Sequence, residues 1–300
     1  MIELTLWDYS NIVSKLLIYI GVAAALGGLF IAALIKPSGD KKPIINYIVI
    51  NSVLGFIAVI INFLIQVGAF SETGVLGMFD TDMASFLWQS AIGDSVLWRL
   101  LAFIALGLAL FFGNINVRYE RLSLKHANFI FLYAAAVFSF AYSFTLVGHS
   151  ADIAGVAKWL LGLHVVMMAW WIGALYPLWL CCKLLPPPAL YKLMCLFGQI
   201  MMFMVGLLIV CGVALLYLFF ASPLELFTTL YGQAMLLKLI FVVSILLIAA
   251  YHKYHLVEEV QEPAIGHKLQ KSIRNEMLIA VIILAITAVL SSVLGPASGA

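Results

Sequence analysis

The sequence contains few charged residues. Of its 300 residues, 10% are Asp, Glu, Lys or Arg and 65% are hydrophobic, whereas soluble domains carry about 25% charged residues. This deficit excludes a soluble core of this size. The formal net charge is only +2, so the basic excess of nucleic-acid-binding proteins is missing as well. We therefore expect a membrane protein that is surrounded by lipid and has no nucleic-acid partner.

Several functional motifs are also absent. The sequence has no Walker A motif, so ATP-driven transport by this chain alone is not expected. It has no CxxC, CxxCH or HExxH motif and no nucleophile elbow, and we do not expect an enzyme. Its four cysteines lie in or beside apolar segments, without the spacing of a secreted disulfide framework.

What the sequence does contain is long apolar segments. Eight of them are long enough to cross a hydrocarbon core, which takes about 20 helical residues. They are continuous rather than alternating, which argues against a transmembrane β-barrel. The predicted fold is an all-α bundle of eight transmembrane helices in a single domain, 1–300. The expected spans are 11–35, 43–67, 94–113, 124–147, 155–182, 189–220, 227–251 and 272–294.

The connections differ in their content of Lys and Arg. Those on one side of the predicted bundle hold twelve of the sixteen such residues: Lys36, Lys41, Lys42, Arg118, Arg121, Lys125, Lys183, Lys192, Lys253, Lys268, Lys271 and Arg274. Because cytoplasmic loops are enriched in Lys and Arg, this side is predicted to be cytoplasmic. Both termini are then predicted to be periplasmic. The polar connection 68–93 on the periplasmic side is expected to include a short interfacial helix.

A predicted helix hairpin, 145–180, contains two histidines. His149 lies in its outer loop, and His164 lies about nine residues into the following span. One face of that span carries His164, Met167, Met168 and Trp171. Imidazole and thioether groups suit a soft transition metal. The alternatives are a solvated loop histidine and a histidine that is hydrogen-bonded between helices.

Further soft ligands follow along the chain. Met201 and Met204 share one face of the next span, and thioethers bind Cu(I) without deprotonation. Cu(I) is therefore expected rather than Cu(II). Cys181, Cys182 and Cys195 lie at the predicted cytoplasmic ends of these spans, where thiolates would accept Cu(I) as it leaves. Ordinary packing by methionine and by small buried cysteines is the alternative.

Two charged residues lie within apolar segments. Lys238 needs a partner or a functional reason at its depth, and its candidate partners are Asp94, Asp152 and Glu225. Glu276 lies about four residues into the last expected span, where it is expected to carry a proton, bind the metal, tune the site or form an ion pair, or else to cap the helix start. His252 is followed by a charged loop and is predicted to be a solvated anchor.

Three segments of the sequence resemble the copper resistance protein D (CopD) family, and together they cover the region 145–296. The first resembles the family's Gly-His loop with its following His and Trp-Ile-Gly helix. The second resembles the Tyr-Gly…Leu…Lys helix, and the third the closing helix with one Glu near its start. They read GHSADIAGVAKWLLGLHVVMMAWWIGALYPL, TLYGQAMLLKLIFVVSILLIAAYHKYHL and SIRNEMLIAVIILAITAVLSSVLGP.

This resemblance implies a copper-binding protein of the bacterial inner membrane that imports copper from the periplasm. It also implies a separate periplasmic CopC-like copper-binding partner. The matched positions are His149, His164, Lys238 and Glu276. Two alternatives stay open: a haem b protein with His149 and His164 as axial ligands, and a copper sensor or assembly factor that does not transport. The sequence does not give the oligomeric state.

Overall fold

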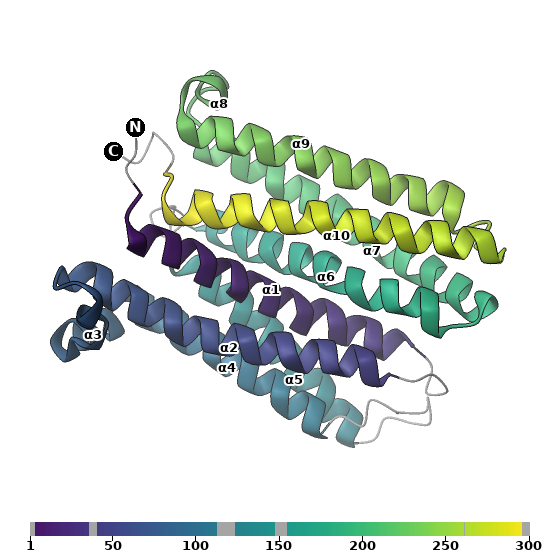
Figure 1. The fold of residues 1–300 in the computed structure, drawn as a ribbon, viewed down its shortest axis with the longest axis horizontal. Helices are drawn as coiled ribbons and strands as arrows, with labels where there is room; N and C mark the ends of the chain where they lie inside the picture. The colour runs from purple at the N-terminus through teal and green to yellow at the C-terminus, as the bar shows by residue number, and fades with distance from the viewer. Residues whose placement is uncertain (1–3, 36–40, 113–123, 148–154, 261, 296–300) are drawn as a thin grey trace.

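The computed structural model describes residues 4–35, 41–112, 124–147, 155–260 and 262–295. Within these residues there is no β-strand, and the long helices lie side by side with their axes nearly aligned (Figure 1). Eight of the helices are long and apolar enough to cross a membrane. The predicted all-α bundle of eight transmembrane helices is therefore confirmed.

Eight long helices and four short ones make up the described chain. The long helices are α1 (Leu6–Leu34), α2 (Lys42–Ser71), α4 (Ala91–Phe112), α5 (Leu124–Thr145), α6 (Val156–Leu184), α7 (Pro187–Phe219), α9 (Leu230–Tyr251) and α10 (Pro263–Ser292). The short ones are the 3₁₀ helix η1 (Val75–Phe79), α3 (Thr81–Trp88), α8 (Glu225–Thr228) and the π-helix η2 (His252–Leu256). α3 and η1 form the short helical segment expected in the connection 68–93.

Local side-chain chemistry sets where several helices begin. Thr5 and Asp8 form a capping box at the start of α1, with the Asp8 N–H donating to Thr5 Oγ1 at 3.3 Å. Proline stands in the first turn of α2, α7 and α10, where its missing N–H leaves no bond unmade. Because Pro263 starts α10 this way, the helix begins nine residues before the predicted position 272. The first turns of α10 are polar, so the helix is longer than the apolar segment from which its start was predicted.

α1 lies at the centre of the bundle. It packs most extensively against α2 and α6 and also contacts α10. Small residues bring α1 and α6 together: a Cβ on Gly173 would lie 1.7 Å from the Ala23 carbonyl oxygen, and one on Gly27 would lie 2.4 Å from the Ala174 nitrogen. In its most apolar part α1 has 67% of its residues buried, compared with 11% for α7 and for α9. α7 and α9 are therefore peripheral helices.

The first and last helices are joined by polar contacts. The Lys15 ammonium donates to the Ser291 carbonyl oxygen at 2.6 Å, and the Tyr19 hydroxyl lies 2.9 Å from Ser291 Oγ. α1 begins and α10 ends at the same end of the bundle (Figure 1). The contacts therefore fasten the N-terminal helix to the C-terminal one.

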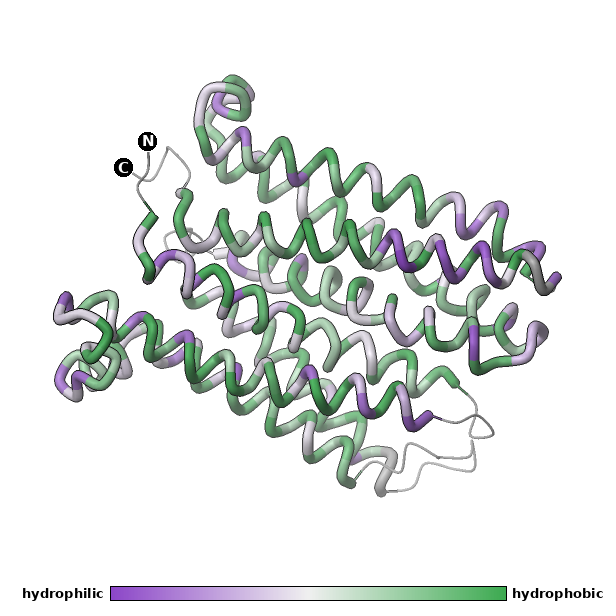
Figure 2. The backbone as a smooth tube through the Cα atoms, in the orientation of Figure 1, coloured by the Kyte–Doolittle hydropathy of each residue, from purple (hydrophilic) through white to green (hydrophobic). Residues whose placement is uncertain are grey.

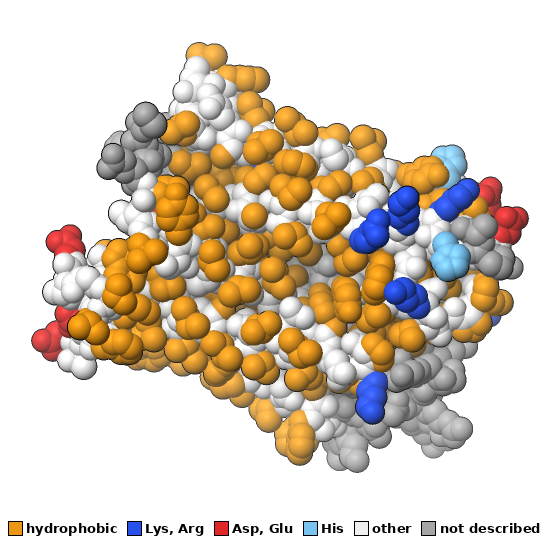
Figure 3. Space-filling view, viewed as in Figure 1, with side chains coloured by type: hydrophobic (Ala, Val, Ile, Leu, Met, Phe, Trp, Pro, Cys, Tyr) orange, Lys and Arg blue, Asp and Glu red, His pale blue; other side chains and the backbone are white. Residues whose placement is uncertain are grey.

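The surface has the pattern of a protein embedded in lipid. Hydrophobic residues follow the helices through the middle of the bundle, and hydrophilic ones gather toward the ends (Figure 2). On the face shown in Figure 3, Lys and Arg lie at the end of the molecule opposite the chain termini, whereas only acidic charges mark the end near the termini. The side chains exposed between these ends are large and apolar, as lipid contact requires.

Candidate functional site

His164 is oriented by helix α7. Its Nδ1 lies 3.2 Å from the backbone carbonyl oxygen of Leu208. A carbonyl oxygen only accepts hydrogen bonds, so Nδ1 carries the proton and Nε2 of the neutral ring keeps a free lone pair. Gly212 lets α7 approach closely, because a Cβ there would lie 3.2 Å from His164 Cε1. The half-buried ring thus presents one nitrogen that is able to bind a metal ion.

Candidate methionines lie along the same pair of helices. Met204 and Met201 precede Leu208 by four and seven residues, so they lie on the α7 face that contacts His164. α7 runs antiparallel to α6, and both methionines are therefore displaced from His164 toward the basic end of the bundle. Met168 follows His164 by one turn in the same direction. Met167 and Met201 are buried, and Met168 and Met204 pack against the core.

Lys238 on α9 lies close enough to His164 for a direct electrostatic interaction. Its side chain is half-buried. Among the described residues its ammonium has neither a hydrogen-bond acceptor nor an ion-pair partner, so it is not paired with Asp94 or Glu225. Asp152, the third predicted partner, lies outside the described residues. The positive charge of Lys238 therefore acts on the surroundings of His164 without compensation from the described chain.

The three candidate cysteines lie at the basic end of α6 and α7. Cys181 is buried, Cys182 and Cys195 are half-buried, and all three are free thiols. His149 lies outside the described residues, so its position relative to His164 is not described. In the described part of the chain, no three His, Cys, Asp or Glu side chains gather closely enough to hold a metal ion. A site there would depend on methionine.

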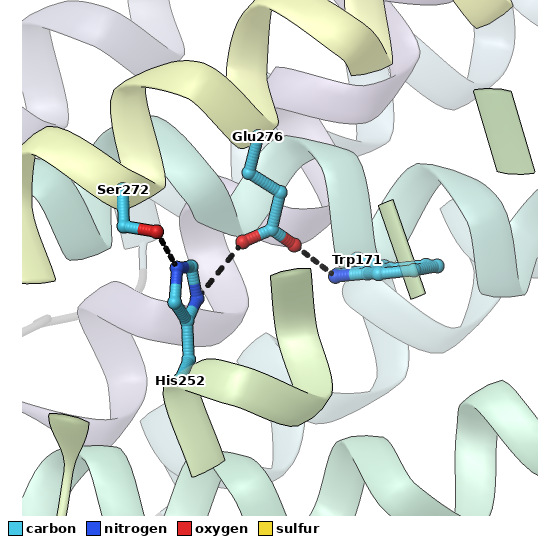
Figure 4. A network of polar contacts seen from close by, with 4 residues as sticks. All are labelled: Trp171, His252, Ser272 and Glu276. Atoms are coloured by element: carbon cyan, nitrogen blue, oxygen red, sulfur yellow. Dashed lines mark hydrogen bonds and ion pairs between the residues drawn. The ribbon is translucent and has the colours of Figure 1, made fainter. Parts of the chain in front are cut away.

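Glu276 is the centre of a buried polar network (Figure 4). Its Oε1 accepts a hydrogen bond from Trp171 Nε1 at 3.1 Å, and its Oε2 lies 3.1 Å from His252 Nδ1. His252 Nε2 lies 2.7 Å from Ser272 Oγ. Glu276 is only 2% exposed. The network connects helices α6 and α10 with the π-helix η2.

The surroundings of Glu276 differ from those expected of a helix cap. Since α10 begins at Pro263, Glu276 lies thirteen residues inside the helix rather than four. A carboxylate at this depth is far from the unpaired N–H groups of the first turn. The capping interpretation is therefore wrong, and Glu276 is a carboxyl group in the interior of the bundle.

His252 is the residue of this network that the sequence pattern did not reveal. It is 9% exposed, not a solvated anchor. The chain beyond it forms the π-helix η2, in which the Val257 N–H bonds to the His252 carbonyl oxygen at 2.9 Å. A π-helix inserts one extra residue into a helical turn and often occurs at functional sites. A histidine that directly continues an apolar helix was the only available signal.

The fold and its buried polar groups together define an all-helical, multi-pass membrane protein with ionisable side chains inside the bundle. Two family models match the chain: "Copper resistance protein D-like, N-terminal domain" over residues 4–159 and "Copper resistance protein D" over residues 191–290. The chain belongs to the copper resistance protein D family. Comparison with curated proteins and comparison with solved structures each gave no match.

The candidate residues lie within the two family matches and in the segment between them. Lys238, His252 and Glu276 lie within the C-terminal match, and His149 lies within the N-terminal one. His164, Met167 and Met168 lie between the two matched segments. Membership of the family makes this a copper-related membrane protein.

Proposed function

We propose that this protein carries copper ions across the inner membrane, from the periplasm to the cytoplasm, through a His/Met site between α6 and α7. The observation that carries the proposal is the His164 ring, whose Nδ1 is held by the Leu208 carbonyl while Nε2 stays free. Metal-binding histidines usually donate their other N–H to a fixed acceptor in this way. Family membership supplies the identity of the metal.

The other soft ligands suit a Cu(I) path that leads away from His164. Met167 and Met168 follow it on α6, and Met204 and Met201 follow on the facing side of α7. The thioethers bind Cu(I) without losing a proton, which suits an apolar interior. Cys181, Cys182 and Cys195 then stand at the basic end, where thiols receive the ion. Lys238 limits the positive charge that gathers beside His164.

The distribution of basic residues supports the inward direction. Lys and Arg gather at the end of the molecule opposite the termini (Figure 3), and such residues favour the cytoplasmic side. His149, in the loop that precedes α6, then receives copper on the periplasmic side from a CopC-like protein.

Copper binding and uptake test the proposal in purified protein and in proteoliposomes. His164→Gln removes the ligand nitrogen at similar volume. We expect Cu(I) affinity to fall by more than the about 10- to 100-fold that loss of an outer-shell partner of a ligand costs, and uptake to stop. His255→Gln is the matched control, because His255 is exposed and its variant should behave as wild type. Met204→Leu, which conserves volume, should weaken binding less.

Two outcomes would contradict the copper site. One is wild-type Cu(I) binding and uptake by folded His164→Gln protein. The other is a Soret band in the purified protein that disappears with the same substitution, which would favour haem b. α7 lies against the His164 ring at Gly212, and this closeness suits an ion better than a porphyrin. Copper binding without uptake would instead indicate the sensor or assembly role.

A further inference from the structure

We propose that His252 and Glu276 form a proton-binding site that releases one proton when copper occupies the bundle. This inference rests on the proposed copper function, since it assigns the proton linked to the same transport step. The proton dissociates from the pair to solvent, no bond to copper forms there, and no electron is transferred. The reaction is therefore an exchange of one cation for another.

The first argument is the charge of the pair. Its side chains are 11% and 3% exposed, and a buried charge without compensation is costly. With one proton, the pair is either an imidazolium with a carboxylate or a neutral histidine with a carboxylic acid, and both are neutral overall. Without it, the pair carries a full negative charge. The interior of the bundle therefore holds the proton until another cation offsets the carboxylate.

The second argument is that neither state needs the side chains to move. In the imidazolium state, Nδ1–H donates to Glu276 and Nε2–H donates to Ser272 Oγ. In the deprotonated state, Nδ1–H still donates to Glu276, and the Ser272 hydroxyl turns to donate to Nε2. The Trp171 indole N–H donates to the carboxylate in both states. All polar atoms stay bonded, so proton release costs no rearrangement.

The third argument is that no other described ionic side chain contacts the pair. The charged groups on the elements packed around it are directed elsewhere. On α6, Lys183 lies over the Trp179 ring, and on η2, Lys253 donates to Met202 Sδ. Of the other charged or titratable groups described at this end, Lys41 donates to the Ala32 carbonyl oxygen, and Tyr191 and the thiols of Cys181, Cys182 and Cys195 form no hydrogen bond to the pair. The rest are exposed: Lys42, Lys192, His255, Glu258, Glu259, Glu262, His267, Lys268, Lys271 and Arg274. α1 contributes no charged residue at this end of the bundle.

The fourth argument is position. Trp171 follows His164 by two turns on the same helix face, a rise of about 10 Å, and donates directly to Glu276. A cation that moves from His164 along Met168 toward the basic end approaches the carboxylate. Its field disfavours the proton, because like charges oppose each other strongly in a low-dielectric interior. Copper and proton thus compete for the same negative charge without sharing a ligand.

The test measures proton release on Cu(I) addition to wild-type protein in weakly buffered solution, using a pH indicator. We expect about one proton per bound copper, as overall neutrality of the pair demands. Glu276→Gln keeps the volume and an acceptor for Trp171, and it should bind Cu(I) at His164 with release reduced at least about tenfold. Glu258→Gln, which alters an exposed acid, is the matched control and should release protons as wild type does.

Three results would overturn the proposal. The first is copper binding by wild-type protein with no proton released, which leaves the copper function intact. The second is that Glu276→Gln releases as many protons per bound copper as the wild-type protein does. The third is release that survives in Glu276→Gln but disappears in Lys238→Met, which would assign the proton to Lys238.

A measurement without copper separates this site from the transport proposal. Difference infrared spectroscopy of the wild-type protein at varied pH reports the carbonyl band of a protonated carboxyl group, assigned by its loss in Glu276→Gln. If that variant does not fold, Glu276→Asp serves to shift the band instead. A band that titrates together with the His252 ring modes supports the proton site even if the protein binds no copper. A carboxyl group that never changes protonation overturns it.

Discussion

Trp171 connects two helices through a single polar contact. Its indole N–H donates to Glu276, and its ring is only 5% exposed. Trp171→Phe keeps most of the ring but leaves one carboxylate oxygen without a donor. Since an unsatisfied buried polar group costs about 1–3 kcal/mol, we expect a clearly lower unfolding temperature in detergent.

The matched control is Trp179→Phe. Trp179 lies on the same helix, half-buried, with its ring under the Lys183 ammonium at 4.0 Å and no buried carboxylate to satisfy. Phenylalanine preserves most of that stacking, so the unfolding temperature should change little. Equal losses in the two variants would show that the Trp171–Glu276 hydrogen bond does not stabilise the fold.

For single residues, the sequence identifies candidate functional side chains but not the contacts that they make. Glu276 and Lys238 were recognisable because a charge within an apolar segment is costly. His252 was not, because Lys253, His255 and two glutamates follow it closely, which is typical of a solvated loop. The π-helix η2, which begins at His252, cannot be predicted from hydrophobic periodicity, because that pattern assumes a regular α-helix.

Small residues bring α1 close to α6, the helix that carries His164 and Trp171. A Cβ on Gly173 would collide with the Ala23 carbonyl oxygen of α1, and backbone atoms cannot move aside as a flexible side chain does. We expect Gly173→Ala to separate the helices and lower stability by about 1–3 kcal/mol. Thermal unfolding and the yield of folded protein in detergent measure this effect.

Gly206 offers the control within a helix of the same bundle. A Cβ there meets nothing within 4 Å, so Gly206→Ala gains helix propensity, worth up to about 1 kcal/mol, without a collision. It should be neutral or stabilising. If Gly173→Ala were equally harmless, the close approach of α1 and α6 would not exist in the membrane.

Most helices could be predicted from the sequence, because about twenty apolar residues in succession leave few alternatives in lipid. The start of α10 could not, since its first turns are polar and depend on Pro263 rather than on hydropathy. The sequence also did not predict which helices pack against each other. Packing of α1 against α6 depends on small residues distant in sequence, and no pattern within either segment specifies its partner.

At the scale of the whole molecule, the even number of candidate spans, eight, predicts that the start of α1 and the end of α10 lie on the same side of the membrane. The basic residues at the opposite end predict that this side is the periplasm. A C-terminal fusion to alkaline phosphatase, which is active only outside the cytoplasm, should be active, and a fusion to green fluorescent protein should stay dark. The reverse pattern would invert the orientation and with it the direction of the proposed path.

The bonds from Lys15 and Tyr19 to Ser291 have a consequence for how the protein is made. The two ends of the Lys15 bond are 276 residues apart in the chain. At ribosomal speeds of about 5–20 residues per second, α1 waits roughly 15–55 s in the bilayer before its last partner is synthesised. During that interval the Lys15 ammonium lacks its Ser291 acceptor, although α2 and α6 are already available to pack against the small residues of α1. The polar fastening of the first helix is therefore the last contact of α1 to form, because it needs the final helix.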